Sequence, residues 1–298
     1  MEPQWDDMKV FLAVAREASL SGAGRILKMD PATVGRRIAR FESSMGTSLF
    51  LKSPQGYALS AAGDRLLVHA EQAEQAMRAA TEAMTGPSDS LSGQIRIGAP
   101  DGSANYLLPQ VCAEISEQNP DLDIQIVALP RVINLSRREA DMAVTVSAPT
   151  AGQLLVQKIC DYQLHMVAHR SYLAQHGPIE RLEDLKGHPM IGYIPDMIFD
   201  KELDYLNDLG IERVALASNS VSVQIRMATN ATALCVAHDF SLPFHKALRK
   251  VLEDEVSLTR SFYLVRHQGD QRSERLNRFA DALSRGIRDE VARLEAAA

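Results

Sequence analysis

Residues 31–45 have the sequence PATVGRRIARFESSM, and this stretch decides the fold of the N-terminal region. Asp30 can accept hydrogen bonds from free N–H groups of a first helical turn, and Pro31 suits the first helical position. At about 100° per residue, four apolar side chains share one face of the predicted helix. They are Val34, Ile38, Phe41 and Met45. We therefore expect this face to be buried.

A different face of the same helix carries a hydroxyl and three guanidinium groups. They belong to Thr33, Arg36, Arg37 and Arg40, and no acidic residue interrupts this stripe before Glu42. Arginine forks match phosphate oxygens and the guanine edge in the major groove of DNA. The pattern predicts a DNA-recognition helix. The alternative interpretation is a solvated basic face on an ordinary amphipathic helix.

The segments around this helix favour DNA recognition. A first helix is predicted over residues 5–17, and a short second helix, rich in small residues, over Ser21 to about Lys28. A tight turn at Met29-Asp30 then leads into the recognition helix. Two short helices joined in this way form a helix-turn-helix. After Gly46, residues 49–59 predict a hairpin or wing with turn residues at its centre, in which Lys52 can reach a phosphate.

Residues 5–63 resemble the winged helix-turn-helix of LysR-type transcriptional regulators. The segments FLAVA, SLS, ATV, RRI, LF and GYALS occur in the family's order. The family often has serine where this chain has Gly35, which removes one expected contact and weakens the helix by up to ~1 kcal/mol. The residues predicted to contact DNA are Ser21, Pro31, Thr33, Arg36, Arg37, Arg40 and Lys52.

Composition and charge agree with a DNA-reading module attached to an acidic body. The 298 residues are 46% hydrophobic and 23% charged, as in an ordinary soluble globular protein. Residues 1–60 hold eight Lys and Arg against six Asp and Glu, so they carry +2, which leaves −8 for the rest of the net −6. No apolar run approaches the ~20 residues of a membrane span. The sequence predicts a cytoplasmic protein without a membrane partner.

A long helix is predicted from a cap at Ser60 to about Met84. Spacings of four and three residues define a heptad seam, typical of a coiled coil between two subunits. Its members are Leu66, Ala70, Ala73, Met77, Ala80 and Met84. The alternative is a single helix lying on its own domain. The resemblance implies that this linker helix pairs with that of a second subunit, giving a homodimer or a dimer of dimers.

The organisation changes after the Gly-, Pro- and Ser-rich residues 86–93, which predict a hinge. From residue 94 onward, strands alternate with helices, which predicts a parallel sheet covered on both faces. Expected elements include a helix over 106–118, strands over 124–127 and 142–146, and a final helix over 274–294. Further elements are expected over 132–138, 164–168, 190–194, 198–209, 214–217, 221–229 and 234–237.

The complete expectation is an α/β protein with an N-terminal winged helix-turn-helix. Residues 1–60 form the DNA-binding domain, 61–85 the linker helix and 86–93 the hinge. The resemblance implies that residues 94–298 form an effector domain with two lobes, like a periplasmic binding protein. The first lobe spans about 94–161 and 267–298, and the second about 162–266, with crossovers near Asp161 and His267.

Parallel sheets bind ligands beyond the carboxyl ends of their strands. The residues there that are expected to contact an effector are Asp101, Gly102, Ser103, Pro130, Arg131, Ser147, Ser218 and Asn219. By resemblance, many relatives have Ser or Thr at position 101. Asp101 can cap its own helix and repels a second anion, so we expect a neutral or amine-bearing effector. Arg131 could offset this by pairing with Asp101 or by holding an anion itself.

The sequence does not favour an enzyme. It has no GxSxG elbow, Walker loop or GxGxxG, and no His/Cys cluster with metal-ligand spacing, so no cofactor or metal is expected. His165, His169 and His176 are interpreted as surface or core histidines. Cys112, Cys160 and Cys235 are widely separated and are expected to be reduced, mostly buried thiols, with a peroxide-sensing pair as the alternative.

A free solute-binding protein is a second alternative, but it would need an export signal and would not carry residues 1–84. The expected function is that of a LysR-type transcriptional regulator that binds an interrupted inverted repeat in promoter DNA. Its other expected partners are a second copy of itself, a small-molecule effector and RNA polymerase.

Overall fold

The computed structural model describes residues 4–53, 56–84, 90–128, 135, 139–150, 152–211 and 213–298. The chain divides into two compact units, Met1–Ser88 and Asp89–Ala298, which are described separately below. The expected hinge is at this division, although residues 85–89 lie outside the described part, and Gly93 already belongs to a strand. No helix in the described part of the chain is long and apolar enough to cross a membrane.

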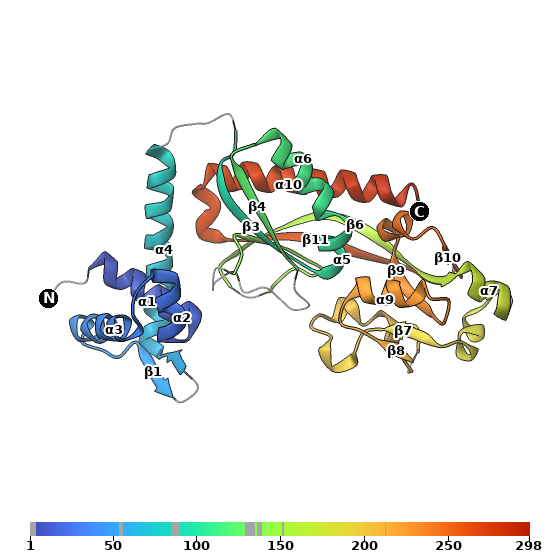
Figure 1. Ribbon diagram of the computed structural model, residues 1–298, viewed down its shortest axis with the longest axis horizontal. Coiled ribbons are helices and arrows are strands. Elements are labelled where there is room, and N and C mark those ends of the chain that lie inside the picture. The colour runs from blue at the N-terminus through green and yellow to red at the C-terminus, as the bar shows by residue number, and fades with distance from the viewer. Residues whose placement is uncertain are drawn as a thin grey trace. The chain divides into compact units, whose positions relative to one another are not determined.

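The first unit is a three-helix cluster followed by a hairpin and a long helix (Figure 1). Its elements are α1 (Trp5–Glu17), α2 (Leu20–Leu27), α3 (Pro31–Met45), β1 (Phe50–Ser53), β2 (Gly56–Leu59) and α4 (Ala61–Met84). The apolar face of α3 is buried through Val34, Ile38 and Phe41, as predicted. Met45 is instead 37% exposed, because α3 ends there, one residue before the left-handed Gly46.

The turn between α2 and α3 has the close approach that its small residues predict. The Ser19 hydroxyl accepts a hydrogen bond from the Gly22 N–H at 3.0 Å and caps α2. A Cβ atom at Gly24 would lie 2.6 Å from the carbonyl oxygen of Met29, so only glycine lets the backbone pass there. Asp30 accepts from the Ala32 N–H at 2.9 Å and so caps α3, as predicted.

Two carboxylates tie the hairpin and the long helix to the three-helix cluster. Glu42 accepts hydrogen bonds from the backbone N–H groups of Leu49 and Phe50, at 2.7 and 3.1 Å. Glu42 therefore holds the start of the hairpin in place and does not belong to the basic face of α3. The Glu74 carboxylate in α4 accepts hydrogen bonds from both terminal nitrogens of Arg16 in α1, at 3.1 and 2.6 Å.

The long helix α4 begins as predicted, since the Ser60 hydroxyl accepts from the Gly63 N–H at 3.0 Å. Leu66 and Ala70, however, pack on the core of their own unit, which is the alternative interpretation of the seam. Further along, Met77 is 53% exposed and Ala80 is exposed. The Met84 side chain lies outside the described residues. Leu66 and Ala70 of the seam therefore pack within their own unit, while Met77 and Ala80 are exposed.

The second unit contains a nine-stranded sheet with the order β4-β3-β5-β11-β6-β9-β7-β8, in which β10 also pairs with β6. Its strands are β3 (Gly93–Ala99), β4 (Leu122–Ala128), β5 (Met142–Thr145), β6 (Leu154–His169), β7 (Met190–Gly192), β8 (Leu216–Ala217), β9 (Leu234–His238), β10 (Leu248–Lys250) and β11 (Ser257–His267). The expectation of a parallel sheet is wrong at the centre, where β6 runs antiparallel to β11 and β9.

The two long central strands connect two lobes. β11 pairs with β5 of the first lobe from Tyr263 onward, and β6 pairs with β9 of the second lobe from Leu164 onward. The register between β6 and β11 shifts at Phe262/Tyr263.

Helices cover this sheet on both lobes (Figure 1). They are α5 (Asp101–Tyr106), α6 (Leu108–Gln118), α7 (Arg170–His176), α8 (Tyr205–Asp208), α9 (Val221–Ala228) and α10 (Glu274–Glu295). The predicted helix over 106–118 corresponds to α6, and the short helix α5, which was not predicted, precedes it. The region 198–209 contains a 3-10 turn and the short α8 instead of one helix. The predicted element over 132–138 lies outside the described residues, except Leu135.

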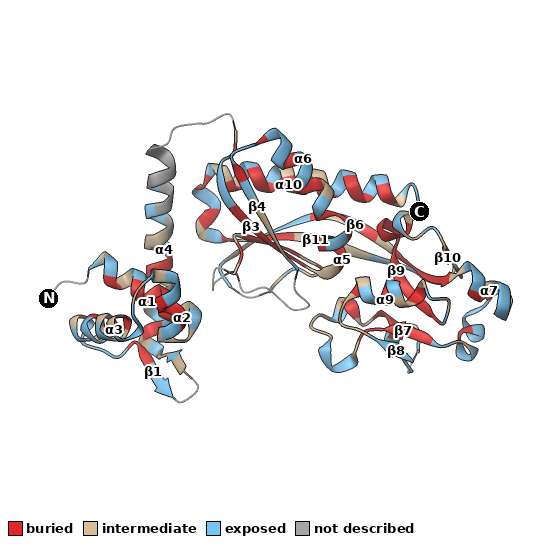
Figure 2. Cartoon of the chain, viewed as in Figure 1, coloured by how far each residue is buried: buried red, intermediate tan, exposed pale blue. Residues whose placement is uncertain are grey.

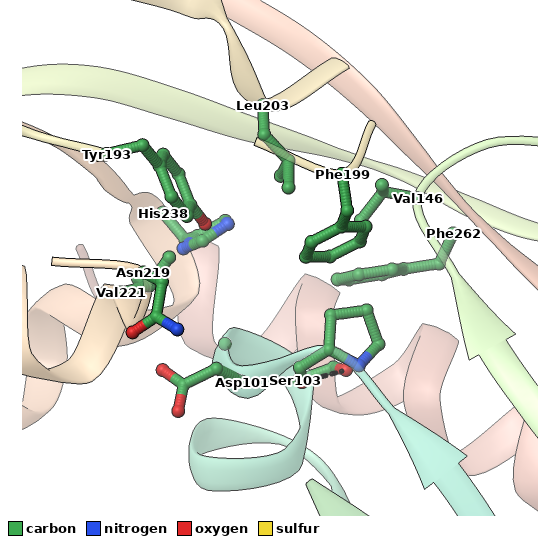
Figure 3. Close-up of a pocket in the computed structure, with 12 residues that line it drawn as sticks. Asp101, Ser103, Val146, Tyr193, Phe199, Leu203, Asn219, Val221, His238 and Phe262 are labelled. Atoms are coloured by element: carbon green, nitrogen blue, oxygen red, sulfur yellow. Dashed lines mark hydrogen bonds between the residues drawn. The ribbon is translucent and has the colours of Figure 1, made fainter. Parts of the chain in front are cut away.

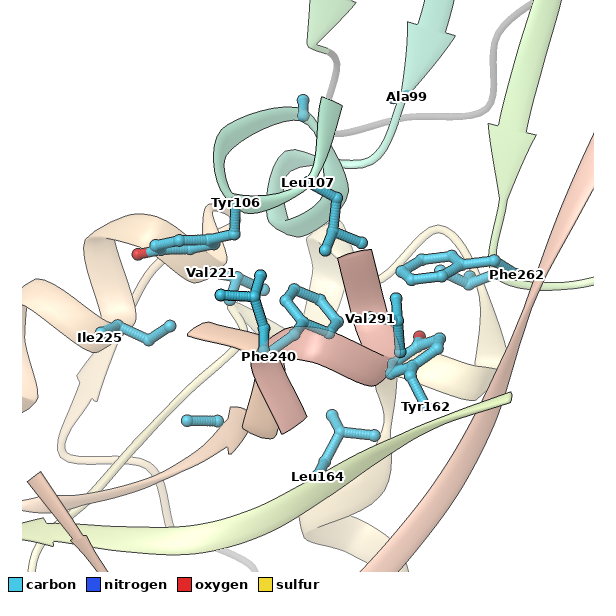
Figure 4. Packing of buried hydrophobic residues seen from close by; sticks show 14 of the residues in the cluster. Ala99, Tyr106, Leu107, Tyr162, Leu164, Val221, Ile225, Phe240, Phe262 and Val291 are labelled. Atoms are coloured by element: carbon cyan, nitrogen blue, oxygen red, sulfur yellow. The ribbon is translucent and has the colours of Figure 1, made fainter. Parts of the chain in front are cut away.

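Aromatic rings fill the centre of the second unit, where the two lobes share one core (Figure 4). The rings of Tyr162 and Phe262, one from each crossing strand, are stacked with centroids 4.1 Å apart. Phe240 packs edge-on against Tyr162 at 5.7 Å. Figure 2 shows that α10 buries one side and exposes the other, as its periodicity predicts. This shared core is continuous across the lobes.

Candidate DNA-binding face and interlobe cleft

The exposed side of α3 carries most of the predicted DNA-contacting residues. Arg36 is exposed, and its guanidinium donates to the Thr33 hydroxyl at 2.9 Å. Arg37 is half-buried, and within the described residues neither arginine has a carboxylate partner. A side chain at Gly35 would lie 3.2 Å from Leu20, so this position faces α2. Glycine in place of the family's serine at position 35 therefore affects the packing of α3 against α2 more than the exposed basic face.

Arg40 differs from the other two arginines because it belongs to an ion pair. Its guanidinium donates to both oxygens of Asp7 in α1, with the Nε to Oδ2 distance at 3.2 Å. The Asp7 side chain is 6% exposed, while that of Arg40 is 47% exposed. The prediction that Arg40 contacts DNA did not anticipate this ion pair. The pairing joins residues that are distant in sequence, so the stripe on α3 alone could not reveal it.

The remaining predicted DNA-contacting residues surround this face. Ser21 and Pro31 are exposed on the first turns of α2 and α3. Lys52 is exposed on β1, and its Nζ lies 5.9 Å from the centre of the Tyr57 ring on β2. That contact orients the lysine along the hairpin without removing its charge. The first unit thus presents a basic helix face and a basic wing.

In the second unit, a small cleft lies between the lobes (Figure 3). Its volume is about 20 Å³, enough for one water molecule. Of the predicted effector residues, Asp101, Gly102, Ser103 and Asn219 line it. Ser147 and Ser218 do not line it: the Ser147 hydroxyl donates to Asp200, and the Ser218 hydroxyl accepts from the Ser220 N–H at 3.1 Å. Pro130 and Arg131 lie outside the described residues.

Asp101 does not cap its own helix, contrary to the expectation. Its Oδ2 atom accepts three hydrogen bonds from the start of α9 in the other lobe. The donors are the Ser220 hydroxyl at 3.0 Å, the Ser222 N–H at 2.8 Å and the Ser222 hydroxyl at 2.9 Å. Asp101 lies at the first position of α5, after the N-cap Pro100. The carboxylate therefore connects the lobes through its hydrogen bonds to α9.

His238 is a cleft residue that the sequence analysis missed. It is 6% exposed at the end of β9, and its Nδ1 atom is buried without a hydrogen-bond partner among the described residues. Burial lowers the pKa of this imidazole to about 4, although the nearby carboxylates of Asp101 and Asp239 oppose the shift. The ring is therefore neutral at pH 7. It lies so close to Gly102 that a Cβ there would be 3.0 Å from the His238 Cε1.

The rest of the cleft wall is mostly apolar and comes from both lobes, including the crossing strand β11. It includes Pro100, Val146, Tyr193, Phe199, Leu203, Val221 and Phe262. Burial raises the pKa of the Tyr193 hydroxyl well above its ordinary value, so this tyrosine stays protonated. The residues predicted from the sequence to line this cleft all come from segments expected to be loops that follow strands. The sequence analysis missed the apolar side chains because their meeting point depends on how β6 and β11 cross.

The described part of the chain contains no group of three or more His, Cys, Asp or Glu side chains that could hold a metal ion. His165 is buried and pairs with Asp239 at 2.8 Å, which makes it a core histidine as interpreted. Burial raises the pKa of the Cys112 and Cys235 thiols to about 12, and that of Cys160 to about 11. Thiols with such pKa values are poor nucleophiles at neutral pH. All three cysteines are free.

The fold and its two sites define a class: a winged helix-turn-helix followed by a two-lobed α/β domain with an interlobe cleft. Residues 5–64 match the family described as bacterial regulatory helix-turn-helix protein, lysR family, and residues 88–288 match the LysR substrate binding domain. The chain belongs to the LysR family.

Individual relatives agree with this assignment. The HTH-type transcriptional regulator CrgA of Neisseria meningitidis is 25% identical over 193 residues, which cover 65% of this chain and 64% of CrgA, just under two thirds of its length. A full-length OxyR variant from Pseudomonas aeruginosa superposes with a TM-score of 0.75 at 13% identity, covering 97% of this chain and 95% of that one. LysG from Corynebacterium glutamicum with bound effector Arg superposes with a TM-score of 0.65 at 17% identity, covering 96% and 98%. These structural likenesses show the fold.

Proposed function

We propose that the protein is a cytoplasmic transcriptional regulator that acts by binding promoter DNA and not by catalysis. The observation that carries this proposal is the exposed face of α3, where Arg36 and Arg37 have no carboxylate partner within the described residues. The helix is anchored by Val34, Ile38 and Phe41 on its other side. Lys52 on the wing adds a phosphate contact beside the groove.

Arg36→Ala and Arg37→Ala should each weaken DNA binding without unfolding the first unit. A base-reading arginine should cost about 1–3 kcal/mol of binding free energy and relax specificity at one base, whereas a phosphate contact should weaken all sequences alike. Gel-shift titration against a promoter site and a scrambled site distinguishes the two. Lys9→Ala is the control, because that lysine on α1 lies outside the predicted DNA-contacting set. Unchanged affinity in both arginine variants would contradict the proposal.

We further propose that the protein is a homodimer or a dimer of dimers and reads an interrupted inverted repeat. Symmetry in the protein requires matching half-sites on the DNA. Support comes from α4, in which Leu66 and Ala70 pack on their own unit while Met77 and Ala80 are exposed on the same seam. A second copy of this helix would cover these residues. Leu66 and Ala70 would then set the position of the helix and not form its partner face.

Placing charge on the exposed seam residues should therefore split the dimer. Met77→Glu combined with Ala80→Glu would bring four like charges together in a parallel pair of helices, while leaving each unit folded. Sedimentation velocity should show half the mass of the wild-type assembly. The matched control places the two glutamates at Gln72 and Ala76, which are also exposed but lie off the seam. An unchanged mass for the seam variant would place the dimer contact elsewhere.

For the interlobe cleft, we propose a small neutral or amine-bearing effector. Its binding is supported by the partnerless Nδ1 atom of buried His238 and by the apolar wall around it. The Asp101 carboxylate repels a second anion across a region of reduced dielectric. An effector of this class would shift the balance between open and closed lobes. The subunits would then pack differently on promoter DNA and against RNA polymerase.

A further inference from the structure

The start of α9 is capped from two directions. Ser220 at the N-cap accepts a hydrogen bond from the Val223 N–H at 3.3 Å. The Ser222 N–H points instead to Asp101, which belongs to α5 in the other lobe. Free N–H groups and the helix dipole make such a terminus favourable for a negative charge. Here the charge comes from the chain itself.

The Asp101 carboxylate is bound as a ligand would be. Its Oδ2 atom accepts hydrogen bonds from two hydroxyls and one N–H, all with donor–acceptor distances within 3.0 Å. Its Oδ1 atom accepts one from the Asn105 side-chain amide at 3.2 Å. Each of these donors is a neutral group. Hydrogen bonds to a charged acceptor are roughly twice as strong as those between neutral groups. The arrangement is therefore an oxyanion site built from neutral donors, with the anion already in place.

His238 indicates independently that this cleft is built for ligands. Its partnerless Nδ1 atom is buried in the same cleft, whose lining includes Asp101 and Asn219 (Figure 3). Two further contacts join α5 and the loop after β5 to the second lobe: the Tyr106 hydroxyl lies 3.0 Å from the His245 Nε2, and Ser147 bonds to Asp200. The cleft is nearly closed around these bridges, with only about 20 Å³ left open.

We propose that Asp101 is an internal ligand, whose carboxylate fills an anion site at the N-terminus of α9 and holds the two lobes closed in place of a free carboxylate. This deepens the proposed effector function, on which it rests for the use of the cleft. The proposal implies that the site suits small carboxylates. In the wild-type chain they cannot bind, because the Asp101 carboxylate already fills the site. Removing Asp101 opens the site to them.

The experiment is chemical rescue of full-length protein carrying Asp101→Ala. Thermal unfolding is followed in sodium chloride, sodium formate or sodium acetate at equal ionic strength, with acetamide as the uncharged counterpart of acetate. The variant should unfold at least about 4 °C below wild type in chloride, since it loses several charge-assisted hydrogen bonds. Formate should restore at least half of this loss. Wild type should respond equally to chloride and formate.

Hydrogen exchange at the Ser222 amide provides a local measurement. Asp101→Ala should speed exchange at least about tenfold in chloride, because the amide loses its acceptor, and formate should slow it again. Glu114→Ala, which removes an exposed carboxylate from α6 in the same lobe, should change neither the melting temperature nor this exchange rate. If Asp101→Ala fails to fold, Asp101→Ser replaces it, because serine keeps a small polar side chain at this position but has no carboxylate.

Three results would overturn the proposal: no rescue by formate, equal stabilisation of wild type, or equal rescue by acetamide. The effector class is tested separately in wild type with 1-propanol and n-propylamine. A wild-type melt that moves with neither compound counts against that effector class, while formate rescue of the variant would still establish the internal ligand. The failure of one proposal is therefore distinguishable from the failure of the other.

Discussion

Asp239→Ala is expected to lower the free energy of unfolding of the second unit by about 3–5 kcal/mol. The Asp239 side chain is 5% exposed and sits between two partners. Its Oδ1 atom lies 2.8 Å from the His165 Nδ1, and its Oδ2 lies 2.8 Å from the Lys250 Nζ. The lysine is only 16% exposed. Removing the carboxylate leaves a buried ammonium group without its counter-charge, which costs far more than the loss of an exposed pair.

Chemical denaturation followed by far-ultraviolet circular dichroism would measure this loss. The fluorescence of Trp5, the one tryptophan of the chain, reports on the first unit and should keep its midpoint. Asp161→Ala is the matched control, since Asp161 pairs with Lys158 on the same strand but both side chains are about half exposed. Such an exposed pair contributes little to stability because water screens it. Similar losses in the two variants would show that burial does not govern these ion pairs.

Arg40→Ala is expected to destabilise the first unit by about 2–4 kcal/mol, below the full value for a buried pair because Arg40 is itself 47% exposed. The substitution leaves the buried carboxylate of Asp7 without its two hydrogen bonds from Arg40. Any loss of DNA binding in this variant would therefore include the effect of a weaker contact between α1 and α3. Trp5 fluorescence during urea unfolding measures the effect, since Trp5 begins α1.

Arg36→Ala serves as the matched control, because its guanidinium bonds only to the exposed Thr33 hydroxyl among the described residues. It should leave the free energy of unfolding within about 0.5 kcal/mol of wild type. A double-mutant cycle with Asp7→Ala isolates the coupling between Asp7 and Arg40. A coupling energy near zero, with Arg40→Ala as stable as Arg36→Ala, would show that the Asp7–Arg40 ion pair does not stabilise the first unit.

Local sequence signals predicted the elements that depend on local chemistry. The cap at Asp30, the periodicity through Phe41 and the cap at Ser60 place α3 and the start of α4 correctly, because capping and helical periodicity involve neighbours within one or two turns. The winged helix-turn-helix and the two-lobed domain follow from such elements together with the family resemblance. Four of the predicted effector residues reached the cleft because strand ends are also recognisable locally.

The partners of charged and polar groups were decided by tertiary structure. Asp7 and Arg40 meet across 33 residues, and Asp101 and Ser222 meet across 121. Both pairings depend on how whole elements pack. His238 reaches the cleft because β9, which ends at His238, pairs antiparallel with β6. The alternation of strands and helices in the sequence predicted a parallel sheet instead. By itself, the sequence determined which segments form helices and strands and which faces they bury. The three-dimensional packing decided which charges are paired, since Coulomb and hydrogen-bond energies depend on distances that chain separation does not specify.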